Sequence, residues 1–332
     1  MVLPFHGRSA PAQQGVGEDK MKYWKITNQD EKHYNMQYKT GLNVDVLPFR
    51  PYGDCEPGGI YYSDTTHILA FLGTPCGPGK WIREVTLPKG ELTYENPGHP
   101  KKWKAHRVIL GERKKITPEV IAELLDLGAD IHVYNDCALC WAAEYGHTDT
   151  VELLLDRGAN IHAENNCALC WAAEYGHTDT VKLLLDRGAN VHAENDWALR
   201  WAAERGRIDT VKLLLDRGAD IHADDDYAVC CMAAIGKTDM VEYLMGLGAD
   251  IHAGEERALL WAAENGHTDT VEFLLDHGAD IHAMNDWALC FAAFFDKTDT
   301  VEFLLDRGAD PKALPSRKYR QKYQNKYVKD IK

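Results

Sequence analysis

The chain has 332 residues, of which 45% are hydrophobic, and a formal net charge of −14. This length allows a large core and more than one module. No run of about 18 apolar residues occurs, so a membrane span is not expected.

Residues 1–20 carry Gly, Pro and Gln and predict a flexible tail. They lack the apolar stretch of a secretory signal, so we expect a protein that is not secreted. The nine cysteines are then expected to be free thiols in a reducing compartment.

Residues 21–113 predict a small α+β domain. Aromatic and β-branched residues favour strands at four places, and residues 64–73 favour a short helix with Asp64 or Thr65 as its N-cap. The predicted strands are 23–27, 59–63, 81–88 and 104–110.

Catalysis in this region would need acid and base groups. Residues 58–64 loosely resemble the glycine–aromatic strand of ADP-ribosyltransferase-like folds, and residues 73–80 superficially suggest a phosphate loop. The phosphate-loop spacing fails, because Thr74 and Trp81 stand where Gly and Ser/Thr are needed. Scattered His and Glu in a small domain are usually surface groups, so we do not expect an enzyme. The candidates are His67, Glu84, His106 and Glu112.

Residues 114–127 predict an N-terminal capping helix, with Thr117 as N-cap and Pro118 as the first helical residue. A cap is needed because a terminal repeat would otherwise expose an apolar face.

Six copies of a 30-residue unit follow, within residues 128–315. In a first helix, Leu199, Ala202 and Ala203 share a face. A second helix, with Thr148 as its expected N-cap, ends before a Gly that favours a left-handed residue. The next segment, such as residues 128–133, is expected to be extended. Tandem units of this length predict a solenoid. The copies begin at Gly128, Gly158, Gly188, Gly218, Gly248 and Gly278.

The unit resembles the ankyrin repeat. The resemblance rests on the Ala-Ala pair, the Gly-His turn, the Leu-Leu-Leu run and the Gly-Ala-Asp/Asn that opens each copy. It implies a mainly α fold, an ankyrin-like helical solenoid of 30-residue repeats behind a small N-terminal α+β domain. Ankyrin units usually have about 33 residues and a Thr-Pro-Leu-His tetrapeptide. Here that tetrapeptide is replaced, for example by Cys137–Cys140, and the hairpin between repeats is expected to be short or lost.

Residues 316–332 carry seven Lys/Arg against one Asp, and an apolar residue recurs at Tyr319, Tyr323 and Tyr327. This pattern predicts a basic C-terminal capping helix. A basic contact for an acidic partner is the alternative. Phe294 and Phe295 are expected either under this tail, which we favour, or at a partner.

The region before the repeats carries a second resemblance. Residues 41–44, 55–64, 82–88 and 102–113, followed directly by 30-residue ankyrin units, resemble the ankyrin repeat proteins of giant DNA viruses of amoebae. This resemblance implies a viral protein located in the host cytoplasm or in the virion.

Two periodic patterns suggest metal binding. Cys137, Cys140, Cys167 and Cys170 resemble a four-thiolate zinc site, and a His recurs once per repeat from His132 to His282. Equivalent residues of stacked helices lie roughly 8–10 Å apart, too far to share a zinc ion. We therefore expect no metal and no cofactor, with each His bonded to local loop backbone. Core stacking is expected for the recurrent aromatics Trp141, Trp171, Trp201, Trp261 and Phe291.

Partner recognition is expected at aromatic and Arg positions that change from copy to copy. Residues 128–315 carry 13 Lys/Arg against 35 Asp/Glu. This charge disfavours nucleic acid along the array and favours a basic protein partner, although it is also consistent with solubility alone. The candidates are Tyr134, Tyr145, Tyr175, Trp197, Arg205, Tyr227, Arg257 and Trp287.

These patterns together predict an interaction scaffold that binds a host or viral protein on the concave acidic and aromatic face of the array. Two alternatives are an adaptor whose N-terminal module modifies a recruited target, and a structural component of the virion. The sequence does not decide the oligomeric state.

Overall fold

The computed structural model describes residues 21–33, 36–50, 57–74, 77–96 and 100–315, together with residues 319, 321 and 323. The chain forms two compact units, residues 1–164 and 165–332, and each is described by itself. The predicted tail of residues 1–20 and most of the predicted C-terminal helix of residues 316–332 lie outside the described residues.

The first unit contains an antiparallel sheet with the strand order β4-β11-β8-β1-β5-β10-β9, and β12 also pairs with β8. Two short ladders, β2 with β3 and β6 with β7, complete the strand set of the described residues. The strands are β1 Tyr23–Thr27, β2 Lys32–His33, β3 Met36–Gln37, β4 Gly41–Val44, β5 Ile60–Asp64, β6 Gly73–Thr74, β7 Gly77–Pro78, β8 Trp81–Thr86, β9 Thr93–Asn96, β10 Lys102–Ala105, β11 Arg107–Leu110 and β12 Lys114–Lys115.

The four predicted strands are present, with one correction. The segment 104–110 forms two strands, β10 and β11, which His106 separates and which pair with different neighbours. Residues 64–73 form only the short 3-10 helix η1, Ile68–Phe71, in which Asp64 accepts a hydrogen bond from the backbone N–H of His67 at 2.9 Å.

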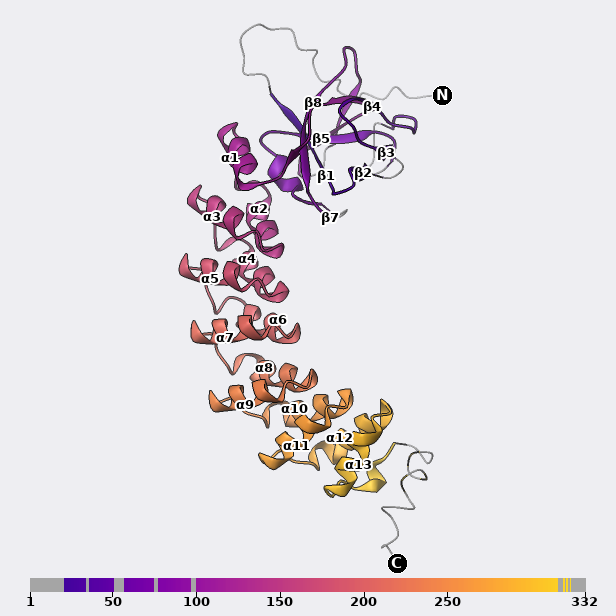
Figure 1. The fold of residues 1–332 in the computed structure, drawn as a ribbon, viewed down its shortest axis with the longest axis vertical. Coiled ribbons are helices and arrows are strands. Elements are labelled where there is room, and N and C mark those ends of the chain that lie inside the picture. The colour runs from indigo at the N-terminus through magenta and orange to yellow at the C-terminus, as the bar shows by residue number, and fades with distance from the viewer. Residues whose placement is uncertain are drawn as a thin grey trace, which may run out of the picture. The chain divides into compact units, whose positions relative to one another are not determined.

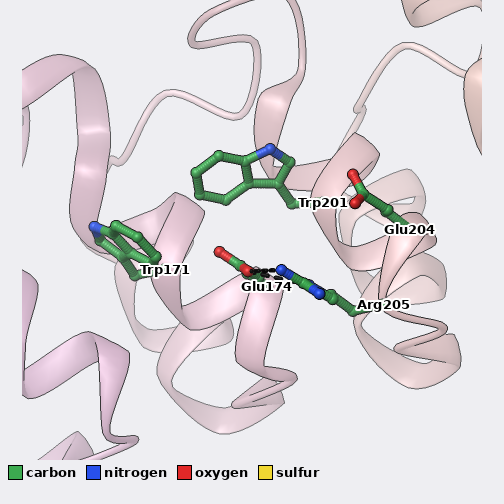
Figure 2. Close-up of a pocket in the computed structure, with 5 residues that line it drawn as sticks. All are labelled: Trp171, Glu174, Trp201, Glu204 and Arg205. Carbon is green, nitrogen blue, oxygen red and sulfur yellow. Dashed lines mark hydrogen bonds and ion pairs between the residues drawn. The ribbon is translucent and has the colours of Figure 1, made fainter.

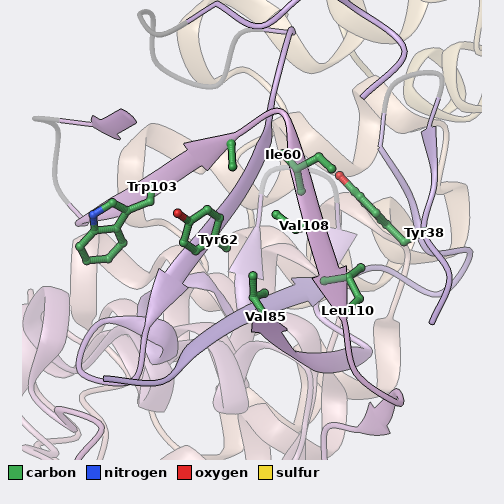
Figure 3. Packing of buried hydrophobic residues seen from close by; sticks show 8 residues of the cluster. Tyr38, Ile60, Tyr62, Val85, Trp103, Val108 and Leu110 are labelled. Atoms are coloured by element: carbon green, nitrogen blue, oxygen red, sulfur yellow. The ribbon is translucent and has the colours of Figure 1, made fainter. Parts of the chain in front are cut away.

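A cluster of buried side chains fills one side of this sheet (Figure 3). Tyr62 and Trp103 lie on the paired strands β5 and β10, and their rings stack with centroids 6.4 Å apart. Tyr23 meets both rings edge-on, with centroids at 5.4 and 5.5 Å. The cluster consists of Tyr38, Ile60, Tyr62, Val85, Trp103, Ala105, Val108 and Leu110.

The first repeat packs against the strand-bearing region within this same unit. Helix α1, Pro118–Asp126, contacts α3, Thr148–Asp156, whereas η1 and β6 contact α2, Val133–Glu144. Asp130 donates its backbone N–H to the carbonyl of Thr66 at 3.0 Å. The N-terminal cap of the array therefore has two parts, because η1 covers α2, the first helix of the first repeat, and α1 covers α3, its second helix. We expected the capping helix alone, so the part of the cap that η1 forms was not predicted.

The second unit contains five helix pairs (Figure 1). The even-numbered helices contact one another in one row, and the odd-numbered helices form the other row. The helices are α4 Ala163–Tyr175, α5 Thr178–Asp186, α6 Trp197–Glu204, α7 Ile208–Asp216, α8 Ala223–Ala234, α9 Thr238–Gly246, α10 Ala253–Asn265, α11 Thr268–Asp276, α12 Ala283–Phe294 and α13 Thr298–Asp306. With the strands of the first unit, they confirm the predicted fold class.

The core of the array follows the apolar spacing of the sequence. The Ala pair of the first helix is buried, as at Ala202 and Ala203, and in α8 a buried Met232 replaces its first Ala. Val211 and Leu214 of the helix that follows α6 are buried as well. Small side chains allow the rows to approach closely, and the β-branched and Leu positions fill the space between them.

A left-handed turn in every repeat was not foreseen. Three consecutive residues directly before the regular turns of each first helix, inside the bounds given above for every such helix except α6, have φ between 45° and 67°, for example 60° at Asp225 and 56° at Asp226. Such backbone costs roughly 1–2 kcal/mol per L-residue, least for Asn and Asp. This turn directly follows the segment expected to be extended, and residues 131 and 132 of that segment also lie in a turn. The six turns are residues 134–136, 164–166, 194–196, 224–226, 254–256 and 284–286.

The third residue of the turn joins consecutive repeats. The buried carboxylate of Asp226 accepts a hydrogen bond from the backbone N–H of Asp250, 24 residues later, at 2.9 Å. The same bond recurs at four other junctions, at 2.8 to 2.9 Å. The backbone N–H groups of Asn160, Asn190, Asp220 and Asp310 are donated to the side-chain oxygens of Asp136, Asn166, Asp196 and Asp286 respectively.

Threonine hydroxyls and exposed ion pairs add contacts between repeats. Thr178 lies 2.9 Å from Thr210, and Thr238 and Thr268 make the same contact with Thr270 and Thr300 at 2.8 Å. Thr148 is the first residue of its helix and not the expected N-cap. Arg217 pairs with Asp186 at 2.7 Å on the second helices, where exposure limits the contribution of the pair to stability.

Replacing Asp226 with Ala should lower the free energy of unfolding by about 1–3 kcal/mol, because the N–H of Asp250 loses its acceptor. Asp226→Asn should cost less, since Asn166 makes the same bond in the second repeat. Asp225→Ala is the matched control, because it bears the same left-handed backbone without that bond. Urea denaturation measures all three variants. An equal loss in Asp225→Ala and Asp226→Ala would contradict the assigned role.

Candidate functional site

The first helix of each repeat presents three positions, four residues apart, that lie on one side of the helix. In α6 these positions are Trp197, Trp201 and the helix-ending Arg205. The two indole centroids are 4.5 Å apart, so the first ring packs on the second. We call the equivalent positions the inner-helix stripe. In the second unit it consists of Cys167, Trp171, Tyr175, Trp197, Trp201, Arg205, Tyr227, Cys231, Ile235, Arg257, Trp261, Asn265, Trp287, Phe291 and Phe295.

Five of the eight predicted contact residues are exposed. Tyr175, Trp197 and Trp287 are between 37% and 43% exposed. Arg205 is also exposed. Tyr134 is 60% exposed, but it lies in the left-handed turn and not on the stripe.

The other three predicted residues are half-buried and engaged within the protein. Tyr227 meets Trp261 edge-on at 5.7 Å, and burial raises the pKa of its hydroxyl to about 12. Arg257 places its guanidinium 6.0 Å above the ring of Trp261 and lies 3.5 Å from Asp225. Tyr145 stacks on His147 with centroids 6.4 Å apart. These residues are therefore only partly accessible to solvent.

The recurrent aromatics were expected to stack in the core, and this prediction is wrong for most of them. Trp141 is 5% exposed, whereas Trp171, Trp201, Trp261 and Phe291 are half-buried. Trp141 is covered because the strand-bearing region lies against it. A Cβ added to Gly73 of β6 would lie 3.1 Å from its ring.

The exposed Phe pair also differs from the favoured prediction. Phe294 remains 67% exposed and Phe295 43% exposed. Tyr319 of the tail donates a hydrogen bond to Asp296 at 3.0 Å, and Tyr323 is buried. The described part of the tail thus contacts the last repeat without covering these rings.

One hollow lies on the inner-helix stripe between α4 and α6, with a volume of about 330 Å³. Trp171, Glu174, Trp201, Glu204 and Arg205 line it (Figure 2). Only Arg205 was predicted as a contact residue. The spacing of Trp197, Trp201 and Arg205 by four residues was the available signal, since it puts them on one helix side.

Three of the cysteines in the described residues are deeply buried. Burial raises the pKa values of Cys170, Cys230 and Cys231 to about 12, which makes these thiols unreactive. No group of three or more His, Cys, Asp or Glu side chains in the described ranges has a geometry that could hold a metal ion.

The recurrent histidines have a different partner from the expected one. Nδ1 of His192, His222 and His282 lies 3.1 to 3.2 Å from the third residue of the left-handed turn, a buried Asp, and not at loop backbone. The backbone N–H of His222 is donated to Asp220 at 2.9 Å. Each of these three histidines thus contacts a carboxylate that joins two repeats.

The four acid–base candidates of the N-terminal region lie at different places in the fold. Nδ1 of His67 is 2.7 Å from Asp64, and Glu112 accepts a hydrogen bond from Thr40 at 3.4 Å. Glu84 is exposed on β8, and His106 separates β10 from β11. A hollow of only about 20 Å³ occurs in the described part of this region, and none of the four lines it.

Comparison with known proteins decides the family. The family model described as Ankyrin repeats (3 copies) matches residues 112–195, 162–225 and 227–314, more than half of the chain. The chain belongs to the ankyrin repeat family. Ankyrin repeats are a general protein–protein interaction module, so the array is a protein-binding element of a known kind.

Relatives of this ankyrin repeat protein occur in Acanthamoeba polyphaga mimivirus. Ankyrin repeat protein R229 is 38% identical over 128 residues, which are 36% of this chain and 40% of the relative. Ankyrin repeat protein R896 is 35% identical over 133 residues, 39% of each chain, and R868 is 32% identical over 135 residues, 40% of this chain and 65% of the relative. The chain thus spans about two fifths of the length of the first two. These matches support a viral origin.

Among solved structures, the ankyrin repeat domain of human ASB11 matches with a TM-score of 0.47 and 26% identity. The match covers 52% of this chain and 85% of that domain. Within the described residues, no helix is long and apolar enough to cross a membrane.

The fifth repeat carries Glu256 in place of the Asp of its neighbours, and this longer side chain gives a test of the histidine contacts. Its Oε1 lies 2.5 Å from Nδ1 of His252, and this hydrogen bond raises the pKa of His252 above 6.5. A raised pKa means that the pair stabilises the fold below about pH 6.5 and that this contribution is lost as the pH rises through the folded-state value. His252 is about half exposed, so the effect on stability is small.

NMR titration of the ring protons should therefore give a pKa above 6.5 for His252 and a lower value in Glu256→Gln. His162, which has Asn166 at the equivalent position, provides the comparison within the same chain. A pKa for His252 that does not change in Glu256→Gln would contradict the contact.

Proposed function

We propose that this protein is a non-enzymatic interaction scaffold that binds a host or viral protein through the inner-helix stripe. One observation carries the proposal. Large aromatic side chains of the stripe, Tyr175 at the third position of its helix and Trp197 and Trp287 at the first, are held partly exposed by regular helices. Rigid aromatic residues and Arg dominate the binding energy of protein interfaces, because they bury much area at low entropic cost.

The charge of the array favours a basic partner. Residues 128–315 carry a net charge of −22 from 13 basic and 35 acidic side chains. Glu164, Glu194, Asp224 and Glu255 of the left-handed turns are exposed beside the first positions of the stripe. An acidic field of this kind speeds the encounter with a basic protein surface and repels nucleic acid.

The test is an affinity experiment with the full chain and a triple variant, Tyr175→Ala, Trp197→Ala and Tyr227→Ala. The bait is immobilised and exposed to an Acanthamoeba extract, since the relatives come from a virus of that host. Proteins retained by the unmodified chain should bind the triple variant at least about tenfold more weakly, as expected for loss of interface anchors.

A matched control carries Lys182→Ala, Glu242→Ala and Glu272→Ala, three exposed positions on the second helices. It should retain the same proteins as the unmodified chain. Circular dichroism checks that both variants fold, because Tyr227 is half-buried. Undiminished retention by the folded triple variant would show that the stripe is not the binding surface.

A further inference from the structure

The hollow between α4 and α6 has walls of two kinds. Trp171 and Trp201 supply aromatic faces, and Glu174 and Glu204 supply carboxylates (Figure 2). The indole centroids are 5.4 Å apart and the ring planes are inclined by 57°, so the rings form a wedge and not a closed stack. Both tryptophans are half-buried, which leaves part of each ring accessible.

Neighbouring aromatic side chains hold this wedge in place. Trp197 packs on Trp201 with centroids 4.5 Å apart, and Tyr175 stacks on Trp171 at 6.2 Å. Each support comes from the same helix, four residues away. The wedge is therefore formed before a ligand arrives, and little side-chain entropy is lost on binding.

The lining carries an excess of negative charge. The largely buried carboxylate of Glu174 accepts two hydrogen bonds from Arg205, from Nη2 at 2.7 Å and from Nε at 3.0 Å. This contact also raises the pKa of Arg205. Glu204 is exposed, so two carboxylates face one guanidinium. The acidic array around the hollow adds to this excess.

The stripe itself shows which group suits its aromatic faces. In the fifth repeat Arg257 lies over Trp261 at 6.0 Å, and Arg200 lies over Tyr227 at 5.7 Å. In the residues that the structure describes, no basic side chain lies over Trp171 or Trp201 in this way. The equivalent site between α4 and α6 thus has the aromatic acceptor without the cation.

We propose that this hollow binds a cationic side chain, Arg or Lys, of a basic protein segment. This inference rests on the proposed function and names the chemistry that part of the inner-helix stripe recognises. The cation contacts the two indole faces, and Glu204 completes its charge balance, while Arg205 stays bound to Glu174. Aromatic faces attract cations through the ring quadrupole, and nearby carboxylates strengthen that attraction.

The experiment titrates the full chain with four small probes and follows the nine tryptophan indole N–H signals by NMR. The probes are the N-acetyl amides of arginine and lysine and of their neutral counterparts, citrulline and norleucine. We expect the cationic probes to shift the signals of Trp171 and Trp201, assigned by Trp→Phe variants, with affinities at least five times those of the neutral probes. The arginine and lysine arms then distinguish guanidinium from ammonium.

Three variants locate the effect. Trp201→Ala should abolish the shift of Trp171, and Glu204→Gln, an exposed change that leaves the fold intact, should weaken cation binding at least threefold. Trp261→Ala, the equivalent change in the fifth repeat, should leave binding at Trp171 unchanged. Unaltered indole signals of Trp24, Trp103 and Trp287, which lie outside α4, α6 and α10, report that each variant is folded.

Equal binding of norleucine would identify an apolar pocket, and equal binding of citrulline would identify a hydrogen-bonding one. Either result would overturn the cation assignment, as would full binding in Glu204→Gln or no binding at all. The unmodified chain can retain proteins from the extract whether or not the hollow binds a cation, because the probe variants change Trp201 and Glu204 while the affinity experiment changes Tyr175, Trp197 and Tyr227. Loss of cation binding in Glu204→Gln with full retention of those proteins by the same variant therefore separates the two proposals.

Discussion

The array depends on one polar contact that recurs through the chain, the acceptance of a backbone N–H by a buried side chain 24 residues earlier. Asp136, Asn166, Asp196, Asp226 and Asp286 all supply this acceptor. Each lies at the end of a left-handed turn that costs free energy by itself. The bond offsets that cost by satisfying a main-chain group at the junction between repeats. Because the bond always joins neighbours, it fixes the spacing of the repeats one step at a time.

The same turn determines what the stripe can present. Three left-handed residues end where the first helix begins, so the first stripe position always follows at once, as Trp197 follows Asp196. Apolar burial acts on the opposite side, where the Ala pair lies in the core. A side chain at the first stripe position therefore cannot reach the core, and its exposure is a consequence of how the repeat is built.

Different elements cover the two ends of the array. At the N-terminal end, η1 and β6 cover α2, and Trp141 becomes a core residue while its aromatic equivalents remain half-buried. At the other end, η2, Pro311–Ala313, contacts α12, and the thiol of Cys290 donates to the carbonyl of Ala313 at 3.0 Å. The same residue type thus serves as core at one position and as surface at another, depending on what lies beside it.

The sequence by itself determined the repeat, its two helices and its buried positions, because periodic Ala and Leu residues record the packing of each unit on its neighbours. It also placed the main strands and the α1 helix, through β-branched runs and through Pro118. The left-handed turns were visible only as an enrichment of Asn and Asp, which equally favours caps and ordinary turns. Tertiary structure alone decided the composite N-terminal cap, the carboxylate partners of the histidines and the hollow at Trp171 and Trp201. The cap and the hollow join residues that are distant in sequence, and a local pattern carries no record of such contacts. Each His lies only four residues from its carboxylate, and the left-handed turn between them decides that contact.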